Sequence, residues 1–205
     1  MAEDASFDID RRRADYRREM KARRRAFNPL ARMKAGEAVA ERLLREMDFD
    51  GLGRVAGYWP VCGELPLDAL VRRLPEACRY HLPQLSANGR LRFAPWRPGD
   101  ALECNRYGIP EPVRAISRSL EPERLDLVLV PLLAFDRRGH RLGMGAGWYD
   151  RSFEVRHAAA PPPLLVGVAY RFQEIAKVPE QPQDVALDFV ATEDELIRCR
   201  GVDRQ

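Results

Sequence analysis

The chain has 205 residues, of which 45% are hydrophobic and 32% are charged. This composition supplies a sizeable core and excludes a fibrous fold and wholesale disorder. The longest apolar runs, 127–131 and 164–168, are too short for a membrane helix, which needs roughly 20 apolar residues. The acidic residues 1–10 contain no apolar segment typical of a secretory signal. We therefore expect a soluble, cytoplasmic protein without a membrane partner.

The net charge of +3 conceals a basic segment near the N-terminus. Residues 11–25 carry nine Arg or Lys against Asp15 and Glu19, so this segment is +7 and the remaining chain is −4. Such a concentration of positive charge indicates binding of a polyanion.

The same segment is rich in helix formers and predicts a helix over 11–27. An apolar stripe along it holds Tyr16, Met20 and Phe27. A cationic face recurs at every fourth residue, at Arg13, Arg17, Lys21 and Arg25. The remaining arginines are expected to be solvated surface charge: Arg11, Arg12, Arg18, Arg23 and Arg24.

Helical and strand-like segments alternate along the rest of the chain. In order we predict a helix over 30–47, a strand over 54–59, a helix over 66–74, strands over 79–82 and 91–94, an ordered surface segment over 95–124, a strand over 127–130, a glycine-rich loop over 139–147, a helix over 148–157, strands over 165–170 and 187–191, and a terminal helix over 193–198.

This alternation predicts an α/β fold with a largely parallel central sheet flanked by helices. We expect one domain over residues 1–205, in which only the order of residues 1–10 is left open. In such sheets ligands bind at the carboxyl ends of the strands, so we expect the site there.

Cysteine and histidine spacing excludes several kinds of site. The four cysteines include no C-x-x-C pair, and the three histidines include no H-E-x-x-H. We therefore expect reduced, structural thiols and neither a zinc ribbon nor a histidine-based metal site.

The glycine-rich loop is the segment that indicates chemistry. Gly139, Gly143, Gly145 and Gly147 follow a buried strand, and such spacing lets backbone amides approach an anion. Arg141 is suited to pair with phosphate oxygens. The pattern is neither a Walker A loop nor a dinucleotide fingerprint, and the glycines alone fit a tight surface turn equally well.

The complete string D-L-V-L-V-P-L-L-A-F-D-R-R-G-H-R-L-G-M-G-A-G-W-Y-D-R, residues 126–151, closely resembles the P-G-x-A-F-D-x-x-G-x-R-L-G-x-G-x-G-Y-Y-D-R pattern of 5-formyltetrahydrofolate cyclo-ligases. The resemblance covers nearly the whole chain. Arg13 and Arg17 resemble the family's K-x-x-x-R opening, and Glu64 its folate-contacting glutamate. Residues 108–112 match G-I-P-E-P, and Asp184 resembles the near-terminal aspartate that helps to hold Mg²⁺.

The resemblance implies an ATP-dependent ligase that converts 5-formyltetrahydrofolate to 5,10-methenyltetrahydrofolate with Mg²⁺. It implies transfer of the γ-phosphoryl group to the formyl oxygen, followed by attack of N10. The catalytic residues are then Arg141 and Tyr149, and the metal ligands Asp150 and Asp184. The implied ATP-binding residues are Arg13, Arg17, Arg141, Leu142, Gly143, Met144, Gly145, Ala146, Gly147, Trp148 and Tyr149. The implied substrate-binding residues are Trp59, Glu64, Tyr107, Met144 and Trp148.

The sequence departs from the family pattern at several positions: Arg13 for lysine, Leu132 for glycine, Trp148 for tyrosine, Gln183 for histidine, and variation at Met144 and Ala146. Tryptophan keeps a flat stacking face, so we expect folate contact to survive. Two alternatives remain: a paralogue with the same ATP site and another substrate, or an RNA-binding protein that uses the arginine-rich helix. The latter leaves the glycine loop unexplained, so we expect small-molecule partners, no nucleic acid and a monomer.

Overall fold

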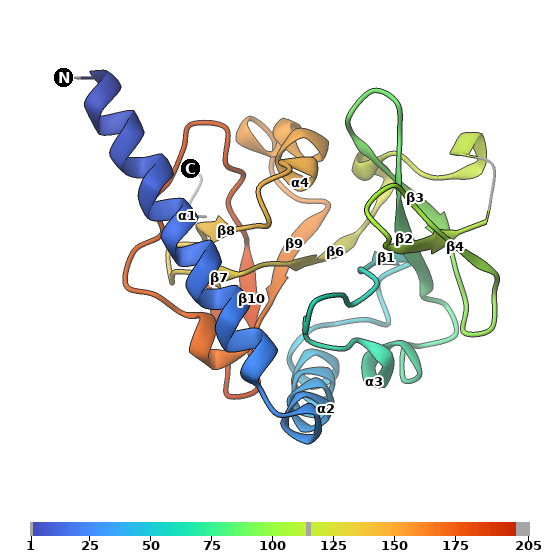
Figure 1. The fold of residues 1–205 in the computed structure, drawn as a ribbon. Helices are drawn as coiled ribbons and strands as arrows, with labels where there is room; N and C mark the ends of the chain where they lie inside the picture. The colour runs from blue at the N-terminus through green and yellow to red at the C-terminus, as the bar shows by residue number, and fades with distance from the viewer. Residues whose placement is uncertain (1, 114–115, 200–205) are drawn as a thin grey trace.

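The computed structural model describes residues 2–113 and 116–199, and its centre is a seven-stranded sheet (Figure 1). Its strands are β1 (Arg54–Ala56), β2 (Arg79–Leu85), β3 (Leu91–Pro95), β6 (Leu127–Pro131), β9 (Leu164–Val168), β10 (Phe189–Ala191) and β11 (Leu196–Arg198). Their order is β11-β10-β9-β6-β1-β2-β3. Neighbours from β10 to β2 pair in parallel, and only the edge strands β11 and β3 are antiparallel, so the predicted fold class is confirmed.

Helices and two small ribbons surround this sheet. The helices are α1 (Ala2–Ala26), α2 (Pro29–Glu46), α3 (Asp68–Val71) and α4 (Trp148–Ser152), with short 3-10 turns at η1 (Ile116–Arg118), η2 (Pro122–Arg124), η3 (Glu154–His157) and η4 (Arg171–Gln173). One ribbon pairs β4 (Leu102–Cys104) with β5 (Pro110–Pro112), and the other pairs β7 (Ala134–Phe135) with β8 (Arg141–Leu142). No helix in the described ranges is long and apolar enough to cross a membrane.

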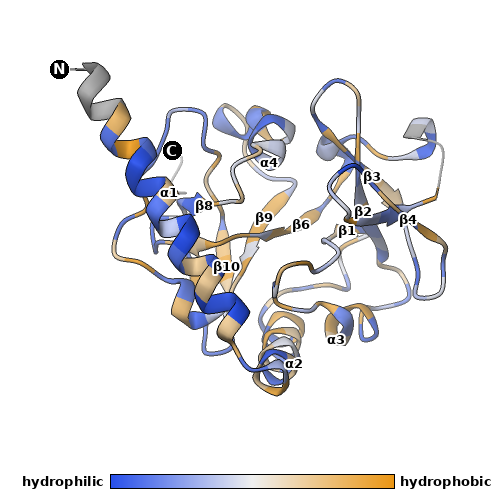
Figure 2. Ribbon diagram, in the orientation of Figure 1, coloured by the Kyte–Doolittle hydropathy of each residue, from blue (hydrophilic) through white to orange (hydrophobic). Residues whose placement is uncertain are grey.

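Continuous apolar runs form the centre of the sheet. β6 and β9 pair in register from Leu127 opposite Leu164 to Pro131 opposite Val168, and the first four residues of β6 are buried. Both strands lie in the orange, hydrophobic interior of the molecule (Figure 2). They are apolar at nearly every position because side chains pack against both faces of a parallel sheet.

The helices cover the two faces of the sheet unequally. α2 begins where the Asn28 side chain accepts the N–H groups of Leu30 (2.8 Å) and Ala31 (3.2 Å), with Pro29 in the first turn. α2 and α3 pack on one face, and Phe153 after α4 packs on the other. α1 lies across the β7–β8 ribbon, where Met20 is buried against its apolar residues. The N-terminal helix is thereby brought beside the loop that follows β8.

Several predicted boundaries were wrong. α1 begins at Ala2, so residues 2–10 are part of it, and the helix predicted over 148–157 breaks into α4 and η3. The predicted terminal helix over 193–198 is instead a turn followed by β11. Thr192 Oγ1 accepts the N–H of Glu195 (3.1 Å), and Ile197 is buried opposite Val190 of β10. Strand pairing and burial thus outweigh the helix propensity of this short segment.

Candidate active site

The glycine loop connects β8 to α4, and a tight turn fixes its position. Asp136 is 1% exposed and accepts the N–H groups of Arg138 and Val178, each at 3.0 Å. Burial raises the pKa of this carboxyl, but the hydrogen bond from the Arg138 side chain and those from the two N–H groups outweigh burial and hold the pKa below its usual value. Beyond the turn, Gly145 (φ +106°) and Gly147 (φ +67°) adopt left-handed conformations that favour glycine.

Two arginines of α1 reach the glycine loop and the segment before β10. The Arg13 guanidinium is buried and pairs bidentately with Asp184, at 2.5 and 3.1 Å, and also donates to the Pro179 carbonyl at 2.8 Å. One turn later, Arg17 Nε donates to the Gly143 carbonyl at 3.0 Å. The first helix therefore contacts the glycine loop directly.

Arg141 lies beneath the loop as a second buried cation. It is 6% exposed, donates to Asp150 Oδ1 at 2.6 Å and also donates to the Val185 carbonyl. The Val185 N–H donates to the same Asp150 oxygen at 3.2 Å, so Asp150 and the segment that contains Asp184 are adjacent. Three predicted arginines and two predicted carboxylates thus converge on one region of the fold.

Arg17 differs from Arg13 and Arg141, because it forms no ion pair with any described residue. Partial burial, followed by the nearby charge of Arg13, lowers its pKa, although a guanidinium remains charged at neutral pH. Its Nη atoms are not occupied by a carboxylate, and a Cβ at Gly145 would lie 3.5 Å from the Arg17 Cζ. This guanidinium beside the loop is suited to an anionic ligand.

The two carboxylates differ in their capacity to bind a metal ion. Both oxygens of Asp184 accept hydrogen bonds from Arg13, whereas Asp150 uses only Oδ1 in its described hydrogen bonds. The described residues contain no cluster of three or more acidic, histidine or cysteine side chains. Mg²⁺ beside phosphates commonly takes only one or two carboxylates, so Asp150 with Asp184 nearby fits that requirement.

Glu64 lies in the interior and has a partner that the sequence analysis missed. Its side chain is 8% exposed, accepts the Val61 N–H at 3.0 Å and lies 3.6 Å from the Arg24 guanidinium. Burial raises the pKa of Glu64, while Val61 and Arg24 oppose that shift. The prediction that Arg24 is solvated was wrong, because this residue is 1% exposed.

Arg24 is not fully satisfied by these contacts. Its Nη1 donates to the Leu132 carbonyl at 3.3 Å, but Nε and Nη2 have no hydrogen-bond partner in the described part of the chain. A signal for its burial existed in the sequence. Arg24 lies four residues after Met20 and eleven after Arg13, which places all three on one face of the helix.

The aromatic residues predicted to bind substrate fall into two groups. Tyr107 and Trp148 meet edge to face, with ring centroids 6.5 Å apart, at the turn between β4 and β5. Trp59 instead packs edge-on against Trp96, at 5.8 Å, on the side of the sheet where α3 lies. The structure brings Tyr107 and Trp148 to the glycine loop and gives Trp59 a packing contact elsewhere.

The remaining predicted residues occupy different environments. Met144 and Ala146 are exposed at the tip of the loop, while Leu142 is buried beneath α1. Tyr149 stacks on Phe153, with centroids 6.3 Å apart, and burial raises the pKa of its hydroxyl. A raised pKa keeps Tyr149 a neutral phenol at physiological pH, so it can donate a hydrogen bond but does not serve as a ready base.

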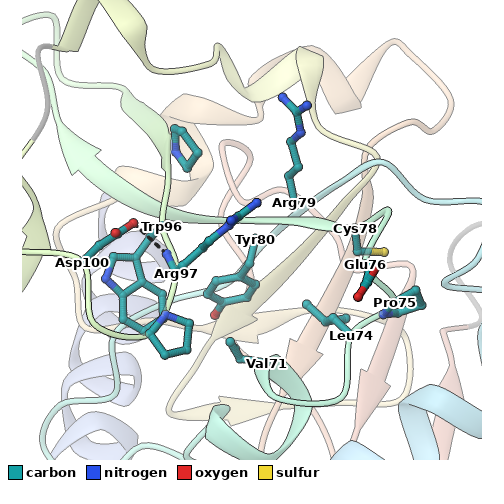
Figure 3. Close-up of a pocket in the computed structure, with 12 residues that line it drawn as sticks. Val71, Leu74, Pro75, Glu76, Cys78, Arg79, Tyr80, Trp96, Arg97 and Asp100 are labelled. Carbon is teal, nitrogen blue, oxygen red and sulfur yellow. Dashed lines mark hydrogen bonds between the residues drawn. The ribbon is translucent and has the colours of Figure 1, made fainter.

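A separate cavity of about 690 Å³ lies between α3 and the β2–β3 hairpin (Figure 3). Tyr80, Trp96 and Val71 line it together with Arg79 and Arg97. Because Arg79 begins β2, this cavity lies at the amino end of that strand, whereas the glycine loop follows the carboxyl end of β6. It contains none of the residues predicted for the site.

Comparisons with known proteins identify the family and the fold of the chain. The model of the 5-formyltetrahydrofolate cyclo-ligase family matches residues 9–193. The Escherichia coli 5-formyltetrahydrofolate cyclo-ligase is 34% identical over 84% of this chain and 96% of its own length, and the Haemophilus influenzae enzyme is 30% identical over 86% and 95%. The NMR structure of Aquifex aeolicus 5,10-methenyltetrahydrofolate synthetase superposes with a TM-score of 0.79, at 29% identity, over 94% of this chain and 95% of that one.

Proposed function

Because the chain belongs to the 5-formyltetrahydrofolate cyclo-ligase family, we propose that it converts 5-formyltetrahydrofolate to 5,10-methenyltetrahydrofolate with ATP and Mg²⁺. The formyl oxygen attacks the γ-phosphorus and ADP departs. The N10 lone pair then attacks the formyl carbon, the carbon–oxygen bond breaks, and inorganic phosphate leaves with that electron pair. N10 loses its proton, so the products are the methenyl cation, ADP and phosphate.

The observation that carries this proposal is the junction between α1 and the glycine loop. Arg17 donates to the Gly143 carbonyl at 3.0 Å and forms no described ion pair, while Arg13 and Arg141 lie beside it in carboxylate pairs. Phosphoryl transfer depends on positioning and on neutralising charge rather than on covalent chemistry by the protein. A fixed set of guanidinium groups around open glycine amides supplies both.

The ion pairs explain how these arginines are positioned. Asp184 holds Arg13 by two hydrogen bonds, and Asp150 holds Arg141, so neither guanidinium has to be ordered when the nucleotide binds. Such preorganisation is the main source of electrostatic stabilisation in enzymes. Arg17 is then the group that contacts the nucleotide phosphates first.

Mg²⁺ would be held by Asp150, with Asp184 as the neighbouring carboxylate, and would neutralise phosphate charge. Asp150 keeps one oxygen outside its described hydrogen bonds, as this role requires. Asp184 takes part only if Arg13 shifts, since both of its oxygens are engaged.

The folate binds on the side of the glycine loop opposite to the nucleotide. Glu64 accepts hydrogen bonds from the amino and ring N–H groups of the pterin, and Trp148 with Tyr107 supplies faces for the aromatic rings. Met144 is exposed within the glycine loop. A contribution of Trp59 to binding stays a prediction, because Trp59 packs against Trp96.

The direct test mixes the protein with 5-formyltetrahydrofolate, ATP and Mg²⁺ and follows the near-ultraviolet absorbance of the methenyl product. We expect growth of this band that depends on both ATP and Mg²⁺. Asp150→Asn should remove the Mg²⁺-dependent turnover, and Glu64→Gln should weaken folate binding more than ATP binding. A folded protein that binds ATP but forms no methenyl band would instead favour the paralogue with another substrate.

A further inference from the structure

Two arginines lie on the ring of Trp148 at the outer edge of the site. The Arg106 guanidinium carbon is 5.4 Å from the centre of this ring, and that of Arg151 is 5.3 Å away. Arg106 also lies 5.2 Å from the ring of Tyr107. We call Arg106, Tyr107, Trp148 and Arg151 the Trp148 rim.

The positive charges of the rim have no counter-ion within the described ranges. Arg106 and Arg151 are both exposed, and neither forms an ion pair there. In contrast, Arg13, Arg24 and Arg141 each face a carboxylate. Both guanidinium groups lie on the same indole without a described carboxylate partner, so a bound anion would neutralise positive charge that the protein leaves to solvent.

Arg151 is also held in a defined position. Its Nε donates to the Gly89 carbonyl at 3.0 Å, which leaves its two Nη groups for a ligand. The Trp148 indole, followed by the charges of Arg106 and Arg151, lowers the pKa of the Tyr107 hydroxyl. The rim is thus an ordered, positively charged aromatic surface.

We infer that Arg106 and Arg151 bind the carboxylates of the glutamate tail of the folate, which makes the Trp148 rim a second recognition site for this substrate. This inference rests on the proposed function. An aromatic ring that ends in a dicarboxylate matches a stacking face flanked by two guanidinium groups.

The competing ligand at this rim is a phosphate of ATP. A Cβ at Gly147 would lie 2.7 Å from Arg151 Nη1, so Arg151 is not far from the glycine loop. The two ligands predict different changes in KM. Loss of a tail contact raises the KM for folate, whereas loss of a phosphate contact raises the KM for ATP.

The experiment compares wild type with Arg106→Gln, Arg151→Gln and the double variant. Turnover is measured with 5-formyltetrahydrofolate and with 5-formyltetrahydropteroate, which lacks the glutamate. We expect the double variant to raise the KM for the glutamylated substrate by about tenfold, as befits two charge-assisted contacts. The KM for the pteroate and the KM for ATP should stay unchanged. Arg97→Gln, an exposed arginine at the separate cavity, is the matched control.

A second measurement is independent of turnover. Calorimetric binding of para-aminobenzoylglutamate is compared with that of para-aminobenzoate, and the preference for the glutamylated compound should be lost in the double variant. In the wild type, this preference should also weaken with added salt, because exposed charge pairs are screened.

The outcomes separate the two proposals. If wild type forms no methenyl product but binds para-aminobenzoylglutamate through these arginines, the proposed function fails and the tail site stands. If turnover is normal and the double variant treats both folates as wild type does, the tail site is overturned. A rise in the KM for ATP alone would assign the rim to the nucleotide instead.

Discussion

The inner face of α1 and the Trp148 rim are both rich in arginine, yet they use it in opposite ways. On α1, Arg13 and Arg24 are at most 5% exposed and face Asp184 and Glu64. At the rim, two exposed guanidinium groups stack on an indole without a described counter-ion. A buried arginine is thus fixed by its carboxylate, whereas the exposed guanidinium groups of the rim have no described carboxylate partner and are open to the anion that we propose.

Among substitutions of the buried arginines, Arg141→Met should have the largest effect. The change leaves Asp150 without its cation and removes the donor to Val185. We expect kcat to fall by about 10²- to 10³-fold, the usual effect of losing one preorganised charge-stabilising group. Arg141→Lys should recover only part of the rate, since lysine cannot reproduce the guanidinium geometry. Unchanged kcat in a folded Arg141→Met protein would contradict the assignment.

Arg24→Met tests whether the pair with Glu64 supports the fold. Leaving Glu64 buried alone should lower the free energy of unfolding by about 3 kcal/mol, measured by urea denaturation. The neighbouring Arg25→Met is the control, because Arg25 is exposed and should change stability by no more than about 0.5 kcal/mol. Equal effects of both substitutions would show that the pair does not stabilise the protein.

Gly145→Ala tests the glycine loop, which connects the inner face of α1 to the Trp148 rim. A φ of +106° strains any residue with a Cβ, so we expect a loss of about 1–2 kcal/mol in unfolding free energy. Gly143→Ala serves as the control, because a Cβ there meets no atom within 4 Å. If both alanine variants unfold at the same temperature, the left-handed loop conformation is not what stabilises this segment.

The titration of Glu64 should change stability and activity least of these tests in neutral buffer. Its folded-state pKa is raised, so its contribution to stability is fully present below the unfolded pKa and is lost as pH rises through the folded pKa. Folate binding has the opposite sign, because only the ionised carboxylate accepts two pterin donors. We expect kcat/KM for folate to fall on the acid side at a pH above the usual glutamate pKa, and Glu64→Gln to remove this limb of the profile. A profile that is identical in the variant would exclude Glu64 as its source.

Much of this molecule could be predicted from the sequence. The apolar runs 127–130 and 165–170 predict buried parallel strands, because a strand covered on both faces must be apolar throughout. The string over 126–151 carries the family resemblance and holds the glycine loop, Arg141 and Asp150 of the proposed site in one segment. The family and the α/β class therefore follow from local patterns.

Only the tertiary structure decided which charges act together. Arg24 and Arg25 are equivalent in composition, but the orientation of α1 buries one against Glu64 and exposes the other. Arg106 and Arg151 are 45 positions apart in the sequence, and both contact Trp148 because the β4–β5 turn lies beside that ring. The segment 196–198 became a strand because β10 offered an unpaired edge. Ion pairing, stacking and edge pairing act between residues distant in sequence, so local propensity carries no information about them.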